Sequence, residues 1–452
     1  MRGTKQSVSM KQQLKKYNNY KDSGIEWLGE IPEHWEVKRI KDAITKIGSG
    51  VTPKGGSETY VDEGIPLIRS QNVYNDGLRL DNVSFITEEV HNKMKNSQLK
   101  PFDVLVNITG ASIGRTCIFP ESVKTANINQ HIIYLRVKKK KVEYFSYYLK
   151  SNTIQEYIMN IQAGTSKEAL NMSQILNIGL PFPESKEQTQ IATYLDAKTT
   201  AIDKKVKLLQ QKIKHYKAYR KALINETVTK GLDKTVKLKD SGISWIGDIP
   251  EHWEVKRLKD VCRIFTGNSI SDKSLFEINK DAYNYIATKD INIHTKQVNY
   301  DNGVYIPKND KSFRITKKNT CLICLEGASA GKKLTFVDRE VAFVNKLCAI
   351  KSFDKNVFDK YIFYLLQTNL FNSQFFELLS GLIGGVSLGL LKYFNILVPA
   401  IKEQQQIANY LDAKTATLDK IVKNIEGQIT TLKELRKTLI NEVVTGKVKV
   451  SA

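Results

Sequence analysis

One stretch of the sequence occurs twice and limits what the chain can fold into. Residues 186–229 and 402–445 align at a constant offset of 216 without a gap, and 26 of their 44 positions are identical. In each copy, mainly apolar residues follow one another at alternating steps of four and three, and this mean step of 3.5 is the coiled-coil period. Neither copy contains a proline, and Gly427 is the only glycine. The pattern predicts two long helices packed on each other, each roughly 55–65 Å long at about 1.5 Å per residue.

The seam of the predicted helix pair has the same spacing in both copies. Arg220 and Arg436 interrupt it near the helix ends, where a buried guanidinium needs a carboxylate partner. We expect that partner to come from another subunit or from a glutamate such as Glu226 or Glu442. The predicted apolar seam residues are Leu195, Ile202, Val206, Leu209, Ile213, Leu223, Leu411, Leu418, Val422, Ile425, Ile429, Leu432 and Leu439.

A second repeat opens each half of the chain. Residues 21–42 and 239–260, the opening repeats, share 18 of 22 residues at an offset of 218 and hold all four tryptophans. We interpret the tryptophans as structural anchors of each globular segment, and we prefer this to a catalytic role for His34 and His252 beside them. The chain is therefore one unit of about 217 residues written twice. Such duplication favours pseudo-twofold symmetry and antiparallel helices, although the spacing alone also permits a parallel pair.

The repeats also predict the domain boundaries and the fold class. Short alternating strands and helical stretches such as 143–160 and 357–379 indicate mixed α/β (α+β) globular segments. We therefore expect two globular domains, related by the internal repeat, that are separated by a long antiparallel two-helix coiled coil. The predicted boundaries are 1–20 for a flexible N-terminal tail, 21–185 and 233–401 for the two domains, 186–232 for the first long helix, and 402–452 for the second helix with a C-terminal tail.

The charge balance points to an anionic partner. Sixty-nine Lys and Arg residues against 47 Asp and Glu give a formal net charge of +22, which favours nucleic acid over a membrane surface. No run approaches 18 consecutive apolar residues, and the N-terminus lacks the apolar core of a signal peptide, so we expect a cytoplasmic protein that contacts no membrane. The five cysteines do not suggest a disulfide framework. Cys321 and Cys324 lie in a predicted buried strand, where their thiols diverge, so we predict no metal site.

The opening repeat GIxWxGxIPEHWEVKRxKD, the helix start KEQxQIAxYLDxKT and their duplication around two divergent segments resemble the specificity (S) subunit of type I restriction–modification systems, the HsdS family. The resemblance covers about residues 21–447. It implies that each divergent segment is a target recognition domain for one half of a split double-stranded DNA sequence, and that the helices fix the distance between the halves. It further implies two modification subunits and, in complexes that contain them, two restriction subunits as partners. S-adenosylmethionine, ATP and Mg are then expected on those partners, and no cofactor is expected on this chain.

The sequence also lacks the motifs of a catalytic chain. We find no Asn/Asp-Pro-Pro-Tyr/Phe motif of amino-methyltransferases, no Gly-x-Gly-x-x-Gly after a strand and no His-Glu-x-x-His. The chain is therefore predicted not to be an enzyme. Two alternatives stay open: a coiled-coil adaptor with two protein-binding domains and no sequence-specific DNA reading, and a self-sufficient methyltransferase.

Side chains suited to reading bases lie beside predicted strand ends. Arg and Lys favour guanine in the major groove, whereas Asn and Gln favour adenine. The loops 109–115 and 326–332 contain the common sequence Gly-Ala-Ser, and they either bring backbone N–H groups to a DNA phosphate or form tight turns between strands. Because the two segments have diverged, we expect two different half-sites and an asymmetric target. The candidate DNA-binding residues are Arg69, Gln71, Asn72, Ser112, Arg115 and Gln130 in the first segment, and Lys289, Asp290, Ser329, Lys332 and Lys346 in the second.

Overall fold

The computed structural model describes residues 15–138, 141–162, 169–243, 246–270, 281–379 and 384–450. Trp245 of the second opening repeat lies outside the described residues. The chain divides into two compact units: unit 1 comprises Met1–Leu208 and Gln428–Ala452, and unit 2 comprises Leu209–Gly427. This division cuts through both long helices, whereas the repeats predicted boundaries at the helix ends. Each unit therefore holds one globular domain together with parts of both helices.

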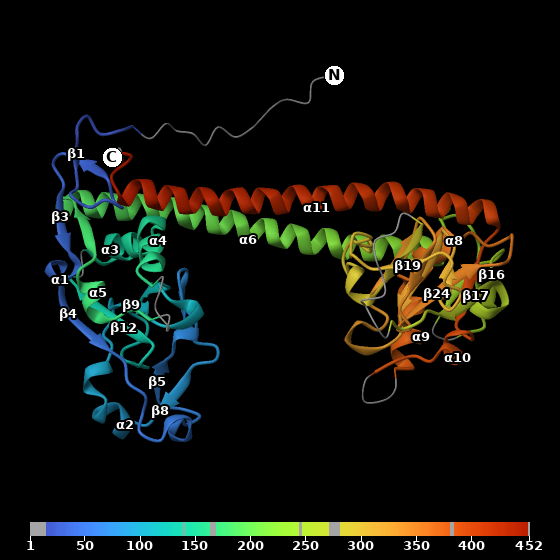
Figure 1. The fold of residues 1–452 in the computed structure, drawn as a ribbon, viewed down its shortest axis with the longest axis horizontal. Coiled ribbons are helices and arrows are strands. Elements are labelled where there is room, and N and C mark those ends of the chain that lie inside the picture. Colours follow the sequence, from blue (N-terminus) through green and yellow to red (C-terminus); the bar gives the residue numbers. More distant parts are fainter. Residues whose placement is uncertain are drawn as a thin grey trace. The chain divides into compact units, whose positions relative to one another are not determined.

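Two long helices, α6 (Ser185–Lys230) and α11 (Ile401–Val444), contain 46 and 44 residues. They pack together as predicted, and the mixed α+β fold class is confirmed (Figure 1). In unit 1 the N-terminal part of α6 lies on the C-terminal part of α11, and in unit 2 the opposite ends are paired, so the helices run antiparallel within each unit. Glycines with positive φ follow both helices, Gly231 at +75° and Gly446 at +73°, and end them in the left-handed conformation that glycine adopts without strain.

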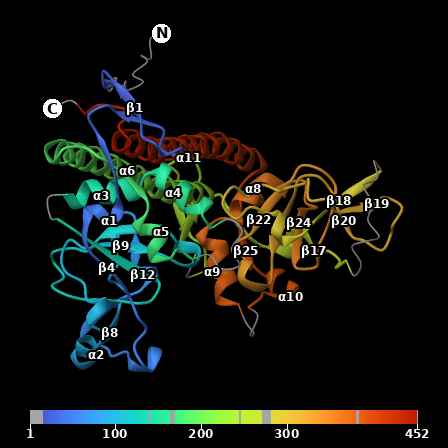
Figure 2. The same cartoon turned by 60° about the vertical axis from the view of Figure 1, so that its left-hand side comes forward.

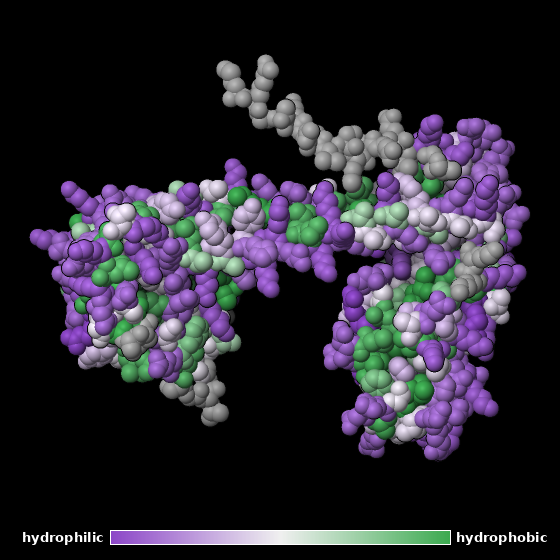
Figure 3. All heavy atoms as spheres, turned by 180° about the vertical axis from the view of Figure 1, so that it is seen from behind, coloured by the Kyte–Doolittle hydropathy of each residue, from purple (hydrophilic) through white to green (hydrophobic). Residues whose placement is uncertain are grey.

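The apolar seam residues are all buried or half-buried. Figure 3 shows hydrophilic side chains interspersed with hydrophobic ones on the visible surface of the long helices, and Leu208, Tyr219 and Leu435 are exposed. The buried seam members are Leu195, Ile202, Leu223, Leu411, Leu418, Ile425 and Ile429, and the half-buried members are Val206, Leu209, Ile213, Val422, Leu432 and Leu439.

The partners predicted for the seam arginines are wrong. The Nε atom of Arg436 donates to Oδ2 of Asp203 at 3.2 Å, and Nε of Arg220 lies 3.2 Å from Oδ1 of Asp419, as an ion pair without the alignment of a hydrogen bond. Each pair joins one long helix to the other within one unit. The prediction searched near the helix ends along the sequence, whereas antiparallel packing brings in a carboxylate from the facing helix.

The globular domain of unit 1 is built around two main sheets with an apolar core between them, and β6 and β7 form a separate hairpin. An antiparallel sheet has the strand order β10-β9-β12-β4, and a second sheet has the order β11-β5-β8, in which β11 and β5 are parallel. Figure 1 shows α3 and α4 between the first sheet and the long helices. The bounds are β4 Ile44–Ser49, β9 Val104–Asn107, β10 Thr116–Ile118, β12 Ile132–Val137, β5 Ile65–Ile68, β8 Ser84–Ile86, β11 Asn127–Ile128, β6 Val73–Tyr74, β7 Gly77–Leu78, α2 Glu88–Lys93, α3 Val142–Leu149, α4 Asn152–Asn160 and α5 Met172–Leu176.

The globular domain of unit 2 has the same plan. Its sheets have the orders β17-β24-β21-β22 and β19-β18-β23-β20, with β18 and β23 parallel (Figure 2). The predicted helical stretches 143–160 and 357–379 each form two helices, because Ser151 and Thr368 have extended backbones and begin a new helix. The bounds are β17 Cys262–Thr266, β18 Ala282–Ile286, β19 Tyr305–Pro307, β20 Ile315–Thr316, β21 Thr320–Cys324, β22 Leu334–Val337, β23 Val341–Phe343, β24 Leu347–Ser352, α8 Asp359–Leu365, α9 Asn369–Glu377 and α10 Leu388–Leu391.

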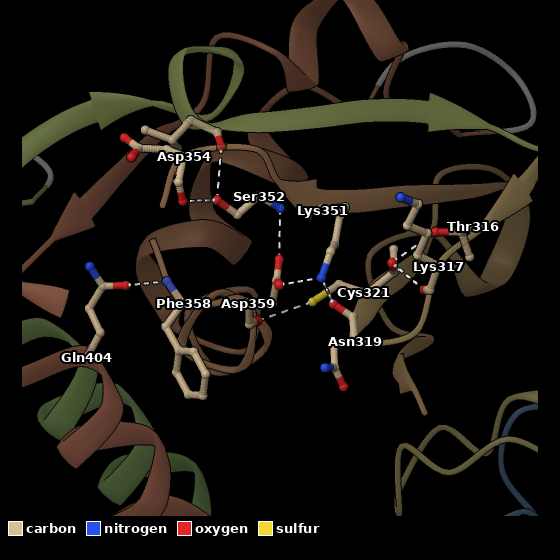
Figure 4. Close-up of polar contacts among 12 residues, drawn as sticks. Thr316, Lys317, Asn319, Cys321, Lys351, Ser352, Asp354, Phe358, Asp359 and Gln404 are labelled. Atoms are coloured by element: carbon tan, nitrogen blue, oxygen red, sulfur yellow. Dashed lines mark hydrogen bonds and ion pairs between the residues drawn. The ribbon is translucent and has the colours of Figure 1, made fainter. Parts of the chain in front are cut away.

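Partly buried polar contacts connect the start of α8 to the first sheet of unit 2 and to the start of α11 (Figure 4). The carboxylate of Asp359 accepts a hydrogen bond from Ser352 N at 2.8 Å and pairs with Lys351 on β24. Gln404 in α11 accepts from Phe358 N at 2.8 Å. The thiols of Cys321 and Cys324 lie in two different cores, one under α8 and one between the two sheets.

The opening repeats join each globular domain to the helix that follows it. Trp35 is fully buried and donates from Nε1 to Glu187 Oε2 at 3.0 Å, and Trp253 donates to Glu403 Oε2 at 3.1 Å. His34 and His252 contact the same carboxylates, which agrees with the structural role that we assigned to these histidines. The bounds are β1 Tyr20–Asp22, β2 Glu30–Pro32, β3 Glu36–Arg39, α1 Ile40–Ala43, β13 Gly179–Phe182, β14 Leu238–Asp240, β15 Asp248–Pro250, β16 Glu254–Arg257, α7 Leu258–Val261 and β25 Asn395–Val398.

The ends of the described chain lie together in unit 1. Tyr17 falls in the segment predicted as a flexible tail, yet its side chain is buried and its hydroxyl donates to Glu187 Oε1 at 2.7 Å. Lys449 N donates to the carbonyl oxygen of Lys15 at 2.7 Å. The described residues that precede β1 are therefore part of the packed structure of unit 1.

Candidate nucleic-acid interface

Four of the candidate residues in unit 1 lie at the carboxyl ends of the parallel strands β5 and β11. Arg69 follows β5 directly, Gln71 and Asn72 lie in the 3₁₀ turn η2 (Ser70–Asn72) after it, and Gln130 follows β11. Asn129 N donates to Ile68 O at 3.0 Å, which continues the pairing beyond both strands. Because parallel strands end at the same edge of a sheet, side chains from positions about 60 residues apart meet there.

Asn107, at the end of β9, connects this edge to the Gly-Ala-Ser loop. Its Nδ2 atom donates to Ser70 O at 2.8 Å and to Ser112 Oγ at 3.0 Å. The Asn107 side chain is fully buried, and its Oδ1 atom has no hydrogen-bond partner among the described residues. The candidate Ser112 therefore lies beside η2. The sequence analysis missed Asn107, whose signal is a polar residue at the end of the apolar run Val104–Val106.

A chain of polar contacts extends from Gln130 toward the same loop. Thr52 Oγ1 donates to Gln130 Oε1, and the Gln130 amide lies 3.2 Å from His131 Nε2. His131 Nδ1 lies 2.6 Å from Thr109 Oγ1. Gln130 is exposed, so this chain fixes the orientation of an amide that faces solvent. The sequence analysis identified only Gln130 among these side chains.

Three guanidinium groups near the candidate edge of unit 1 pack against tyrosine rings. Arg115 and Arg79 lie 4.9 and 5.2 Å from the ring centroid of Tyr74, and Arg69 lies 5.9 Å from that of Tyr60. Tyr74 is exposed at the hairpin of β6 and β7. Stacking on a ring restricts an arginine while its charge stays near solvent, which suits recognition of bases and phosphates. Tyr74 and Arg79 were not among the predicted residues.

Asn72 and Asp290 occupy equivalent turns and have mainly internal partners. Asn72 is 3% exposed: its Oδ1 accepts from Arg69 N at 3.0 Å, and its Nδ2 donates to Arg79 O at 2.9 Å. Asp290 is 8% exposed, and its Oδ2 accepts from Ala287 N and from Asn302 Nδ2, both at 2.8 Å. In this conformation both side chains stabilise a turn.

Two other candidates of unit 2 lie at the carboxyl ends of β18 and β23. Lys289 is exposed in the turn η7 (Thr288–Asp290), and Lys346 is exposed just beyond β23. Lys333 Nζ donates to Thr288 O at 2.6 Å and joins the second Gly-Ala-Ser loop to η7.

That second loop presents one exposed cation and one half-buried hydroxyl residue. The exposed Lys332 donates from Nζ to Ala328 O at 3.2 Å. Ser329 is half-buried, and its carbonyl accepts from Lys332 N at 3.0 Å. The edge in unit 2 is therefore formed mainly by lysines, whereas the edge in unit 1 combines glutamines with stacked arginines.

The described residues give no geometric support for metal chemistry or membrane insertion. No group of three or more His, Cys, Asp or Glu side chains in the described ranges could hold a metal ion. Burial raises the pKa of the Cys117 thiol to about 12, so this thiol is protonated near neutral pH. No helix in the described part of the chain combines the length and apolarity that crossing a membrane requires.

Comparison with known proteins connects these features to one family. The family model described as "Type I restriction modification DNA specificity domain" matches residues 32–215 and 250–431. The type I restriction enzyme MjaIX specificity subunit of Methanocaldococcus jannaschii is 24% identical over 440 residues, which are 94% of this chain and 95% of that protein. The EcoKI specificity subunit of Escherichia coli K12 is 21% identical over 93% of this chain and 90% of that protein.

Solved structures share the fold at low sequence identity. A chain from a structural study of complex assembly and conformational transition of the type I R-M system has a TM-score of 0.72 and 15% identity, and the match covers 92% of this chain and 98% of that chain. The HsdS subunit of Thermoanaerobacter tengcongensis has a TM-score of 0.55 and 15% identity with the same coverage.

Proposed function

Because the chain belongs to the family of type I restriction–modification DNA specificity domains, we propose that it reads a split, asymmetric sequence in double-stranded DNA, one half through each unit. The chain is a non-catalytic specificity subunit, and its part in the system is DNA target specificity. We prefer this assignment to the two alternatives, a coiled-coil adaptor and a self-sufficient methyltransferase.

One observation supports an asymmetric DNA target: the two units have the same backbone arrangement at the candidate edge but different side chains on it. Gln71 corresponds to Lys289 and His131 to Lys346, each pair at the same place relative to its parallel strands, whereas Gln130 corresponds to Asn345. Amides pair well with adenine, and lysines pair with the guanine acceptors. Equivalent positions with different chemistry favour two different half-sites.

The contacts divide the candidates by role. Gln71, Gln130, Lys289 and Lys346 are exposed and are our proposed base readers, together with the stacked Arg69 and Arg115. Ser112, Ser329 and Lys332 lie in the Gly-Ala-Ser loops, where backbone N–H groups and a cation suit a phosphate. We assign Asn72 and Asp290 to holding the turns.

The proposed complex also needs partners. Relatives named as specificity subunits of type I restriction enzymes suggest that this chain docks two modification subunits, which would carry S-adenosylmethionine, and in some complexes restriction subunits that use ATP and Mg. We place the complex in the cytoplasm. In this arrangement α6 and α11 would set the spacer between the half-sites.

Mapping methylated sites tests the proposal. The chain is co-expressed with a modification subunit in a host without other methylation, and modified positions are mapped across the genome. We expect a two-part motif with unlike halves. Gln71→Ala should relax one half and Lys289→Ala the other, so each variant is the control for the other. Genome-wide methylation without a motif, or identical changes in both variants, would refute the proposal.

A further inference from the structure

A basic groove lies in unit 2 where the C-terminal part of α6 faces the globular domain. It has a volume of about 760 Å³. Among the described residues that line it there is no Asp or Glu, whereas two structural elements supply cations. Its basic side chains are Lys217, Arg220 and Lys221 of α6, and His294, Lys296 and Lys332 of the globular domain.

Lys296 lies in this groove in an energetically unfavourable conformation and environment. Its Nζ atom donates to Lys332 O at 2.7 Å, and its backbone has φ of +60°, a conformation that a residue with a side chain rarely adopts. Burial, followed by the positive charge of Arg220, lowers the pKa of Lys296 to about 8. Asp419 balances part of the Arg220 charge. An anion bound in the groove would offset the remaining repulsion between Lys296 and Arg220.

Unit 1 has a similar arrangement made from different residues. Arg436 of α11 is the repeat equivalent of Arg220. Lys150, just after α3, is half-buried, and its pKa is lowered to about 8 by burial, with a contribution from Arg436. Lys150 corresponds in the repeat to Gln367 and not to Lys296. The two diverged domains thus place a lysine near the seam arginine from unrelated sequence positions, which favours a shared function for this location.

We propose that the groove of unit 2 binds backbone phosphates of duplex DNA next to the bases read by that unit. This inference rests on the proposed function. Lys332 lines the groove, and the neighbouring Lys333 donates to Thr288 O at 2.6 Å in the turn η7 of the candidate edge, so a DNA strand at the edge continues into the groove. Gln367 and Asn369 add amide donors to the lining. Cations and amides that converge on a concave surface match the phosphodiester chain, which they position without reading sequence.

The test compares two double variants of α6 in the complex with the modification subunit. Lys217→Ala/Lys221→Ala removes two groove charges. Lys212→Ala/Lys230→Ala removes two exposed charges from the same helix outside the groove lining, and it is the matched control. Affinity for the mapped target is measured from 50 to 200 mM salt.

The groove variant should bind with a shallower salt dependence. Each phosphate contact contributes about 0.9 to the slope of log affinity against log salt, so losing two contacts reduces the steepness of that slope by about 1.8. Between 50 and 200 mM salt, the factor by which the groove variant binds DNA more weakly than the wild type should therefore shrink about 12-fold. The control should keep a slope near that of wild type. Methylphosphonate linkages at the contacted phosphates should weaken the wild type and the control but not the groove variant.

Several outcomes decide the question. Equal slopes for the groove variant and its control would overturn the proposal, as would equal sensitivity to methylphosphonate. Competition by millimolar inorganic phosphate without any effect of methylphosphonate would assign the groove to a small anion and would also overturn it. Failure of the groove proposal leaves the two-part methylation motif of the wild type intact, whereas failure of the proposed function removes that motif. An unchanged motif in both variants shows that they fold.

Discussion

Replacing Asn441 should loosen the attachment of the unit 1 domain to α11. The Oδ1 atom of Asn441 accepts from Thr153 N at 2.9 Å and from Thr153 Oγ1 at 2.8 Å, in the first turn of α4. The long helix thus caps a helix of the globular domain. Asn441→Ala removes both hydrogen bonds, each worth about 1 kcal/mol. If the free energy that stabilises α4 against local opening falls by about 2 kcal/mol, the equilibrium constant for that opening rises about 30-fold.

Two further variants calibrate this value. Asn441→Asp keeps the oxygen acceptor, so it should retain most of the protection of α4. In unit 2, Asn225 Oδ1 accepts only from Asn369 N, at 2.8 Å, among the bonds described. Asn225→Ala should therefore cost about 1 kcal/mol and raise the opening of α9 about 5-fold.

Hydrogen exchange measured by mass spectrometry on the full chain reports both sites. Peptides covering 152–160 and 369–377 should exchange faster in the respective alanine variants, with the larger effect in unit 1. Exchange of α4 at the wild-type rate in Asn441→Ala would refute the reasoning. So would an aspartate variant that exchanges as fast as the alanine variant, because the acceptor would then be irrelevant.

Four other substitutions probe the core, the candidate edge and the groove. Leu411→Ala, at a fully buried seam position, should lower the free energy of unfolding by about 2–5 kcal/mol, measured as a shift of the denaturant midpoint. Asn72→Ala should destabilise its turn by about 1–3 kcal/mol in the same assay, whereas Gln71→Ala should change the methylation motif and leave the midpoint unchanged. The DNA affinity of the wild type should fall as the pH rises through the lowered pKa of Lys296, about 8, because the neutral amine no longer attracts phosphate. The Lys296→Arg variant should keep its DNA affinity up to pH 9. Without DNA, the free energy of unfolding should rise from pH 8 toward the ordinary lysine pKa of about 10.4, since the unfolded chain then binds the proton that the folded chain has released.

The repeats made the architecture predictable. The seam spacing of 3.5 was enough to predict α6 and α11, and the alternating apolar runs were enough for β9, β12 and β21. The breaks at Ser151 and Thr368 were missed because the apolar periodicity continues across both residues, and the cap geometry depends on the backbone there.

The candidate edge was only partly predictable. Residue type and position beside a strand end indicated Gln71 and Gln130. The pairings of β5 with β11 and of β9 with β12 are long-range contacts, however, and together they bring Asn107 next to the turn that contains Gln71. Asn72 has the composition of a base reader, and only its hydrogen bonds distinguish a turn residue from a reader.

The partner of Arg220 shows the same limit. Sequence spacing left parallel and antiparallel helices open, and each orientation brings different residues opposite the arginine. Only the observed packing selects Asp419.

The ion pairs of the long helices have an evolutionary consequence. Subtracting the repeat offset of 216 from Arg436 and Asp419 gives Arg220 and Asp203, so the two pairs are one contact made twice. A symmetric homodimer follows the same rule, in which residue i meets j and j meets i. Each half of the chain thus carries both the Asp and the Arg that this contact needs. Recombination within the opening repeats, which share 18 of 22 residues, would then combine recognition domains from different genes and create new target sequences while this contact between the helices is kept.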